Sequence, residues 1–133
     1  MDRSEAVAYA AGYMDGEGHF SVRQNKVEVS AESVNPYPLI FLSEAFGGNV
    51  TRRDARNERS RATFRWRLYG DRARAFSEEI LERLLVKRPE AYAVVHSKDY
   101  PEDSQTGQVL RERAVAWRQK EFAELPLWED PHE

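Results

Sequence analysis

The stretch Ala10-Ala11-Gly12-Tyr13-Met14-Asp15-Gly16-Glu17-Gly18 decides the fold, because it ends one helix and leads into the strands that follow. A helix is expected over residues 3–16, since Asp2 and Glu5 have the spacing of a capping box. Gly16 and Gly18 then end it. Asp15 and Glu17 therefore lie at a helix C-terminus, where the helix dipole already supplies about half a negative charge.

Two carboxylates at that helix end are unfavourable unless a cation binds there. Carboxylate and carbonyl oxygens are the ligands that Mg²⁺ and Ca²⁺ prefer, so both carboxylates and the last carbonyls of the helix, including that of Gly16, are candidate metal ligands. The chain has no Cys, which excludes thiolate metal sites and cysteine nucleophiles. The alternative is that both acids are simply solvated.

Small residues form a stripe along the same helix. Ala8, Gly12 and Gly16 recur at four-residue spacing, with Ala11 beside them. Gly in a helix interior costs about 1 kcal/mol relative to Ala, which indicates that another backbone packs closely there. We expect a second copy of the chain to pack on this helix across a twofold axis. The expected dimer interface is Ala8, Ala11, Gly12, Asp15 and Gly16; the alternative is packing against the chain's own core.

With 133 residues, the chain is expected to form one domain over residues 1–125, followed by a flexible acidic tail over 126–133. Its apolar runs are far shorter than the roughly 20 residues of a membrane-spanning helix, and its charged start lacks the pattern of a signal peptide. A cytoplasmic location is therefore expected. The net charge of −3 by itself speaks against nucleic-acid binding, because phosphate affinity needs clustered cations.

The charge is distributed unevenly along the chain. Residues 50–74 contain nine Arg and three acidic residues, whereas residues 99–133 contain nine acidic residues and four basic ones. Guanidinium groups bind phosphate oxygens and guanine edges, so the segment 50–74 is expected to face nucleic acid and the acidic tail is not. A solvated basic surface is the alternative.

Hydrophobic periodicity predicts the remaining elements. Strands at 19–24 and 26–31 form a tight hairpin, a helix covers 35–46, and strands at 49–53 and 61–69 are joined by a polar loop. Three further helices are expected: one that begins at Gly70, one from Pro89 to about Lys98, and one after Gly107. This order predicts an α+β fold with one antiparallel sheet, helices on one face of it, extra C-terminal helices and an open second face.

Strand alternation assigns the side chains to the two faces of that sheet. Phe64, Trp66 and Leu68 alternate with arginines, so one face belongs to the core and the other is cationic. Glu28 on the cationic face would repel phosphate, but it can accept a hydrogen bond from cytosine N4. Arg52 and Arg53 are expected to contact backbone phosphates. The residues expected on the open face are Ser21, Arg23, Lys26, Glu28, Ser30, Glu32, Arg61, Thr63, Arg65 and Arg67.

The stretch 10–18 resembles the signature of the LAGLIDADG homing endonucleases, in a variant that ends Asp15-Gly16-Glu17-Gly18. The similarity continues through the first hairpin, the helix that ends before Gly47-Gly48, the Arg-Trp-Arg strand and the segment Leu84-Leu85-Val86-Lys87-Arg88, and covers about residues 5–98. The resemblance implies an αββαββα fold with a four-stranded, saddle-like antiparallel sheet. It also implies the single-motif type, which acts as a homodimer.

The resemblance further implies sequence-specific cleavage of double-stranded DNA at a long pseudo-palindromic site, by metal-dependent hydrolysis, in intron or intein homing. Glu17 would then bind Mg²⁺, for which Mn²⁺ or Ca²⁺ can substitute in binding, and Asp15 would tighten the helix end and support the site. Lys87 falls at a position where members of this family often carry a basic residue near the active site. The resemblance implies that Lys87 stabilises charge or positions water there. The alternative for Lys87 is a solvated side chain at a helix end. The implied partners are DNA and a second copy, with no small-molecule substrate.

One position departs from the family pattern. Ala31 falls where some members place a Gln that holds the water network, and Ser33 or Glu32 is the candidate substitute. This departure keeps open a second function, a cleavage-deficient DNA- or RNA-binding module such as an intron maturase or a regulator. A third possibility, an acidic interaction domain without nucleic acid, has only the net charge in its favour.

Overall fold

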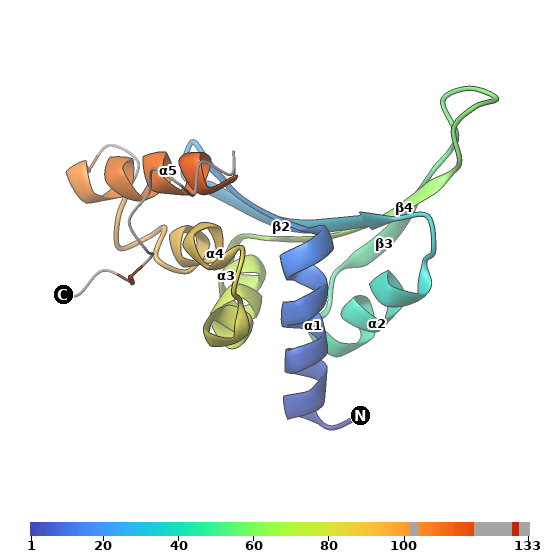
Figure 1. The fold of residues 1–133 in the computed structure, drawn as a ribbon, viewed down its shortest axis with the longest axis horizontal. Coiled ribbons are helices and arrows are strands. Elements are labelled where there is room, and N and C mark those ends of the chain that lie inside the picture. Colours follow the sequence, from blue (N-terminus) through green and yellow to red (C-terminus); the bar gives the residue numbers. More distant parts are fainter. Residues whose placement is uncertain (102–103, 119–128, 131–133) are drawn as a thin grey trace.

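Helix α1 (Arg3–Glu17) stands beneath the middle of a β-sheet in the computed structural model, which describes residues 1–101, 104–118 and 129–130 (Figure 1). The predicted capping box is present: the Asp2 carboxylate accepts a hydrogen bond from the Glu5 N–H at 2.8 Å, and the Glu5 carboxylate accepts one from the Asp2 N–H at 3.3 Å. The helix ends where Gly18 adopts extended backbone. The predicted span of 3–16 is confirmed to within one residue.

The first two strands form the expected hairpin. Strand β1 (Gly18–Arg23) pairs antiparallel with β2 (Lys26–Ser33), and Gln24 and Asn25 make the turn between them. Both turn residues have positive φ, 52° and 61°. Two-residue turns of this kind match the right-handed twist of the strands they join, so the turn fixes the register of the hairpin.

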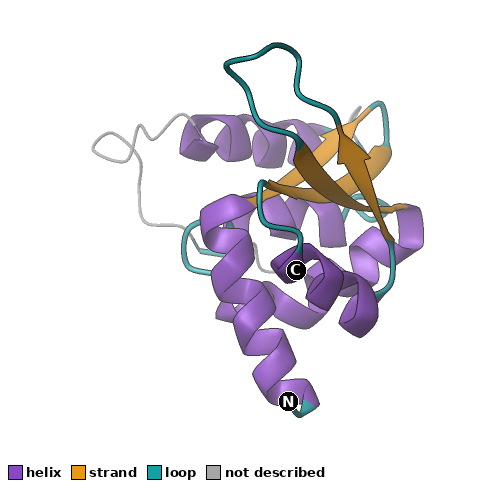
Figure 2. Cartoon of the chain, turned by 90° about the vertical axis from the view of Figure 1, so that its right-hand side faces the viewer, coloured by secondary structure: helices purple, strands orange, loops and turns teal. Residues whose placement is uncertain are grey.

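The sheet has four strands in the order β1-β2-β4-β3, and all neighbouring strands are antiparallel. Helix α2 (Tyr37–Phe46) leads from β2 to β3 (Asn49–Arg53), and β4 (Thr63–Tyr69) leads into α3 (Gly70–Ile80). Helices α1, α2 and α3 lie on one face of the sheet (Figures 1 and 2). The predicted α+β fold of αββαββα order, with helices on one face, is confirmed.

The core lies between these helices and the sheet. Met14 of α1, Phe20 of β1 and Trp66 of β4 are almost completely buried in it. The indole Nε1 of Trp66 also donates a hydrogen bond to the Gly47 carbonyl at 2.8 Å, which satisfies its polar atom in the core. Trp66 is thus a core residue, as strand alternation predicted.

The chain after α3 departs from the predicted helices. A short 3₁₀ turn (Leu81–Arg83) follows α3, so Leu84 is buried but lies outside the helix. Helix α4 (Arg88–Val95) is shorter than predicted, and α5 (Gln105–Arg118) packs on α4. The expected domain end at residue 125 and most of the expected acidic tail lie outside the described residues. Among the described helices, none is both long and apolar enough to span a membrane.

Candidate active site and nucleic-acid interface

Glu17 is the last residue of α1, and the chain continues directly into β1 at Gly18. Its side chain is exposed, and within residues 1–101, 104–118 and 129–130 it has no hydrogen-bond or ion-pair partner. Its charge still acts on its surroundings. Burial raises the pKa of Tyr13 above the ordinary 10.0, a hydrogen bond with Ser33 opposes the shift, and the nearby Glu17 carboxylate adds to it. Glu17 is therefore a carboxylate whose ligand capacity the described fold leaves unused.

Asp15 is used in a different way. Its carboxylate accepts hydrogen bonds from the backbone N–H groups of Leu85, Val86 and Lys87, at 2.9, 3.0 and 3.0 Å. These donors come from the turn between the 3₁₀ segment and α4, about 70 residues along the chain. Asp15 thus ties the end of α1 to this turn.

Lys87 lies close to the motif because of that tie. Its backbone N–H donates to Asp15, and its ammonium group donates to the carbonyl of Gly18, the first residue of β1. Gly18 has no room for a side chain, since a Cβ there would lie 2.4 Å from Met14 Cε and 2.8 Å from Met14 Cα. The structure therefore brings Asp15, Glu17 and Lys87 together at the junction of α1 and β1.

The small-residue stripe of α1 faces away from the core. Ala8, Gly12 and Gly16 are exposed, and a Cβ built at Gly12 or Gly16 would meet no atom within 4 Å. Packing of this stripe against the chain's own core is therefore excluded for the described residues. Ala11 is a correction to the expected interface: only 1% of it is exposed, because its position on the helix turns it into the core.

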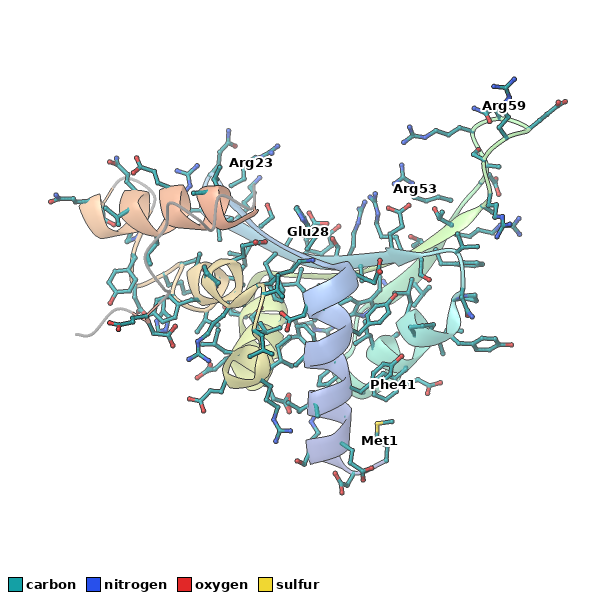
Figure 3. The ribbon with its side chains drawn as sticks, in the orientation of Figure 1. Met1, Arg23, Glu28, Phe41, Arg53 and Arg59 are labelled. Carbon is teal, nitrogen blue, oxygen red and sulfur yellow. The ribbon has the colours of Figure 1, made fainter. Side chains whose placement is uncertain are left out.

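The sheet face opposite the helices carries the predicted polar residues. Figure 3 shows the side chains of Arg23, Glu28 and Arg53 on this face, with Arg59 near the tip of the loop between β3 and β4. The cross-strand register places the following residues together on it: Ser21, Arg23, Lys26, Glu28, Ser30, Glu32, Thr63, Arg65, Arg67, Asn49, Thr51 and Arg53. We call this set the open sheet face.

Arginines and glutamates are paired across the strands of the open sheet face. Glu32 of β2 accepts a hydrogen bond from the Thr63 hydroxyl at 2.7 Å and one from Arg65 Nη2 at 3.4 Å. Arg53 Nη1 lies 3.6 Å from the same carboxylate. One row further, Arg67 Nε lies 3.4 Å from Glu28 Oε1. The face is thus an alternating charge array and not a uniformly cationic surface.

Three predicted contact regions lie elsewhere. Arg52 pairs with Phe64, whereas Arg53 pairs with Thr63, so strand alternation puts Arg52 on the opposite side of β3, where it is ion-paired with Asp54 at 3.4 Å. Arg61 precedes β4, because β3 ends at Arg53 and offers no partner beyond Thr63. The last two arginines of the segment 50–74 lie on α3, which packs on the helix side of the sheet: Arg72 and Arg74.

The candidate substitutes for the missing Gln are also placed. Ala31 is 3% exposed and points into the core between Gly18 and Trp66. Ser33 accepts a hydrogen bond from the Asn35 N–H at 3.1 Å. Glu32 is bound to residues of β3 and β4. Each side chain is therefore engaged in contacts within the chain.

Two features of the site were not predicted from the sequence. The Asp15 clamp joins residues too far apart for any local pattern to indicate it. The pairing of Glu28 and Glu32 with specific arginines depends on the register of β2 against β4, although alternation had put all of them on one face.

Comparisons with known proteins agree with this architecture. No family model and no curated protein matches the chain. Among solved structures, the homing endonuclease I-CvuI in complex with its target, in the presence of Ca, is similar with a TM-score of 0.60 and 16% identity, over 98% of this chain and 88% of that one. The archaeal intron-encoded homing endonuclease I-Vdi141I, complexed with DNA, has a TM-score of 0.58 and 14% identity, over 99% and 91% of the two chains.

A further structure of I-CvuI, with the I-CreI target in the presence of Mg and with DNA not cleaved, has a TM-score of 0.59 and 16% identity, over 98% and 87% of the chains. At these identities the similarity establishes the fold. The chain has the fold of the LAGLIDADG homing endonucleases.

Proposed function

We propose that the chain is a sequence-specific endonuclease for double-stranded DNA that cuts a long pseudo-palindromic site as a homodimer, by metal-dependent hydrolysis of phosphodiester bonds. The observation that carries this proposal is the layout of α1. Its end presents the exposed Glu17 carboxylate beside Lys87, its side presents the exposed Ala8, Gly12 and Gly16 stripe, and the open sheet face begins directly after it.

The homodimer draws support from the surface next to the stripe. Leu85 and Val86 are held beside the end of α1 by Asp15, yet 83% and 49% of these residues are exposed. Apolar side chains beside a glycine stripe form the kind of surface that another chain covers. Packing two α1 helices along their stripes would bring both Glu17 carboxylates close to the dimer axis.

The donor set fits a hard divalent cation such as Mg²⁺ and is incomplete in a single chain. Glu17 and the Gly16 carbonyl are oxygen donors, as Mg²⁺ and Ca²⁺ require. No group of three His, Asp or Glu residues suited to a metal occurs among the residues that the structure describes. Glu17 from each copy, together with DNA phosphate oxygens, would complete the site. When bound, the cation polarises the phosphate and lowers the pKa of water.

The other roles in the proposed reaction belong to side chains of the protein. Glu17 would supply an oxygen ligand to the cation at the helix end, which sets where the cation-bound phosphate lies relative to α1. The Lys87 ammonium, oriented by the Gly18 carbonyl, supplies positive charge for the phosphate as negative charge grows on the departing 3′ oxygen. Arg23 and Lys26 of the open sheet face hold backbone phosphates, which sets the register of the DNA on the sheet.

A second function, binding of DNA or RNA without cleavage, is favoured by one observation. Ala31, which the family resemblance places at the water-holding Gln, is buried, and Ser33 and Glu32 are engaged in other contacts. A chain without that water network could keep its binding surface and lose its chemistry.

Glu17→Gln tests the two functions against each other. The wild type and the variant are incubated with Mg²⁺ or Mn²⁺ and a DNA library that contains the native locus of the gene, and cutting, nicking and binding are measured. Glu44→Gln is the matched control, because Glu44 is an exposed residue of α2 on the far side of the sheet. We expect the wild type and the control to cut, and Glu17→Gln to bind with cleavage reduced at least about 100-fold.

Binding without cutting by the wild type, unchanged in Glu17→Gln, would reject the nuclease and support the binding module. Absence of binding at low salt both to the DNA library and to an RNA transcript of the same locus would reject both functions.

A further inference from the structure

The glutamates of the open sheet face form ion pairs with arginines that would otherwise be available to bind DNA. Glu32 contacts Thr63, Arg65 and Arg53, and Glu28 contacts Arg67. Arg67 Nε is buried and makes no hydrogen bond among the described residues, so the Glu28 carboxylate 3.4 Å away is the charge that compensates it. Removing either carboxylate would leave guanidinium groups without an anionic partner in the chain.

The outer end of the same face is different. Arg23 and Lys26 face each other across the β1–β2 hairpin, and neither has an ion pair within the part of the chain that the structure describes. The open sheet face therefore has two zones. The hairpin end offers cations that are ready for phosphate, and the middle offers cations already bound to carboxylates.

DNA offers two kinds of partner to such a face. The phosphate backbone carries only acceptors and negative charge, so a carboxylate beside it is repelled. A G·C pair in the major groove carries acceptors on guanine, which match Arg, and an amino donor on cytosine, which matches Glu. An Arg–Glu pair can thus exchange its internal contact for contacts with a base-pair edge, whereas against phosphate only the Arg is satisfied.

We propose that Glu28 and Glu32 are specificity-determining residues, which hold Arg53, Arg65 and Arg67 away from non-specific phosphate contacts and release them only to DNA whose base edges also satisfy the carboxylates. This inference rests on the proposed DNA binding and goes beyond it. Partly exposed ion pairs of this kind contribute little to stability. They are therefore strong enough to bias the choice of partner and weak enough for a matching sequence to break them.

The test compares Glu32→Gln and Glu28→Gln with wild type and with Glu44→Gln. All three substitutions remove one negative charge and are nearly isosteric, but Glu44 lies on α2, away from the open sheet face. Binding by fluorescence anisotropy is measured across a salt series with two probes. One is a duplex of random sequence, and the other is a duplex selected by the wild-type protein from a randomised library.

We expect Glu32→Gln to bind the random duplex roughly 3- to 8-fold more tightly and with a steeper salt dependence, by about one unit of slope for each freed arginine. Affinity for the selected duplex should change less, so discrimination falls. Glu28→Gln should act in the same direction, and Glu44→Gln should leave both affinities within about 1.5-fold. In an Arg53→Gln/Arg65→Gln background, Glu32→Gln should no longer tighten random binding, since its effect acts through these arginines.

The proposal is overturned if the face variants and Glu44→Gln tighten random binding equally, because the effect would then be one of net charge. It is also overturned if wild type discriminates between the probes and Glu32→Gln, folded by circular dichroism, discriminates just as well. In both cases DNA binding itself stands. Failure of wild type to bind either duplex at low salt would instead remove the proposed function, and this inference with it.

Discussion

At the scale of single residues, the two motif carboxylates separate into different tasks. Glu17 is exposed and has its oxygens available to a ligand, whereas Asp15 uses its oxygens on three backbone N–H groups. A motif with two acids thus contains one that is exposed to solvent and one that joins two distant segments of the fold. Position decides this: Glu17 is the last helical residue, and Asp15 lies two residues earlier, facing the turn before α4.

Asp15→Asn should lower the free energy of unfolding by about 1–3 kcal/mol, because the amide replaces one acceptor oxygen with a donor that faces a backbone N–H. Urea unfolding followed by tryptophan fluorescence measures this. Asp54→Asn is the control, since Asp54 is exposed and contacts only Arg52 at 3.4 Å among the described residues. Equal stability of Asp15→Asn and wild type would contradict the clamp.

At the scale of elements, α1 is fixed at both ends. At its C-terminus Asp15 holds the turn before α4. At its N-terminus Arg3 donates two hydrogen bonds to Glu79 of α3, at 2.7 and 2.6 Å, and a third to the Ala45 carbonyl at the end of α2. The Arg3 guanidinium also lies 4.6 Å from the centre of the Phe46 ring. These contacts hold α1 in place while its stripe stays exposed.

The Arg3–Glu79 contact makes stability depend on pH. Hydrogen bonds from Arg3 hold the pKa of Glu79 below its ordinary value of 4.5. A carboxyl whose pKa is lower in the folded state adds stability that is present above the unfolded pKa and is lost as the pH falls through the folded pKa. The difference in urea midpoint between wild type and Glu79→Gln should therefore be largest near neutral pH and shrink as the pH is lowered from about 5 toward 2.

Glu78→Gln is the control for this pH series, because Glu78 is the exposed neighbour on the same helix. It should show no comparable change with pH. A difference between wild type and Glu79→Gln that stays constant over the series would mean that Arg3 does not act through the Glu79 charge.

At the scale of the whole molecule, net charge describes the protein poorly. The chain totals −3, yet its open sheet face presents arginines interleaved with glutamates. The arginine-rich segment 50–74 is also not one surface, since it supplies the open sheet face, the β3–β4 loop and the first turns of α3. Spatial arrangement, and not the sum of charges, determines what this molecule can bind.

Gly12→Leu tests the assembly. Because a Cβ at the exposed Gly12 would meet no atom within 4 Å, the variant should fold. Because Leu fills the space that a second helix needs, the dimer should dissociate. Sedimentation velocity should show a dimer for wild type and for Glu78→Leu, which adds the same side chain on the exposed surface of α3, and a monomer for Gly12→Leu. A Gly12→Leu dimer, or a wild-type monomer, would remove α1 as the interface.

The element order, the alternation of the strand faces and the presence of two carboxylates at the end of α1 could be predicted from the sequence. These depend on local properties: the capping box at Asp2, the alternation around Trp66, and the glycines after Asp15. Such signals act over a few residues, so the printed sequence contains them in full. The start of β4 at Thr63 and the end of α3 at Ile80 were harder to predict from the sequence. Pairing partners and packing determine where these elements begin and end.

Only the tertiary structure decided which side chains meet. Lys87 lies beside Gly18, and Asp15 is hydrogen-bonded to the turn at residues 85–87. Arg52 and Arg53 lie on opposite faces of β3, and Glu32 is ion-paired with Arg65. Each of these depends on strand register or on contacts between distant segments. A one-residue shift in register would exchange the two faces of a strand while leaving its local pattern intact. The sequence therefore indicates which chemical groups are available, and the fold determines which of them act together.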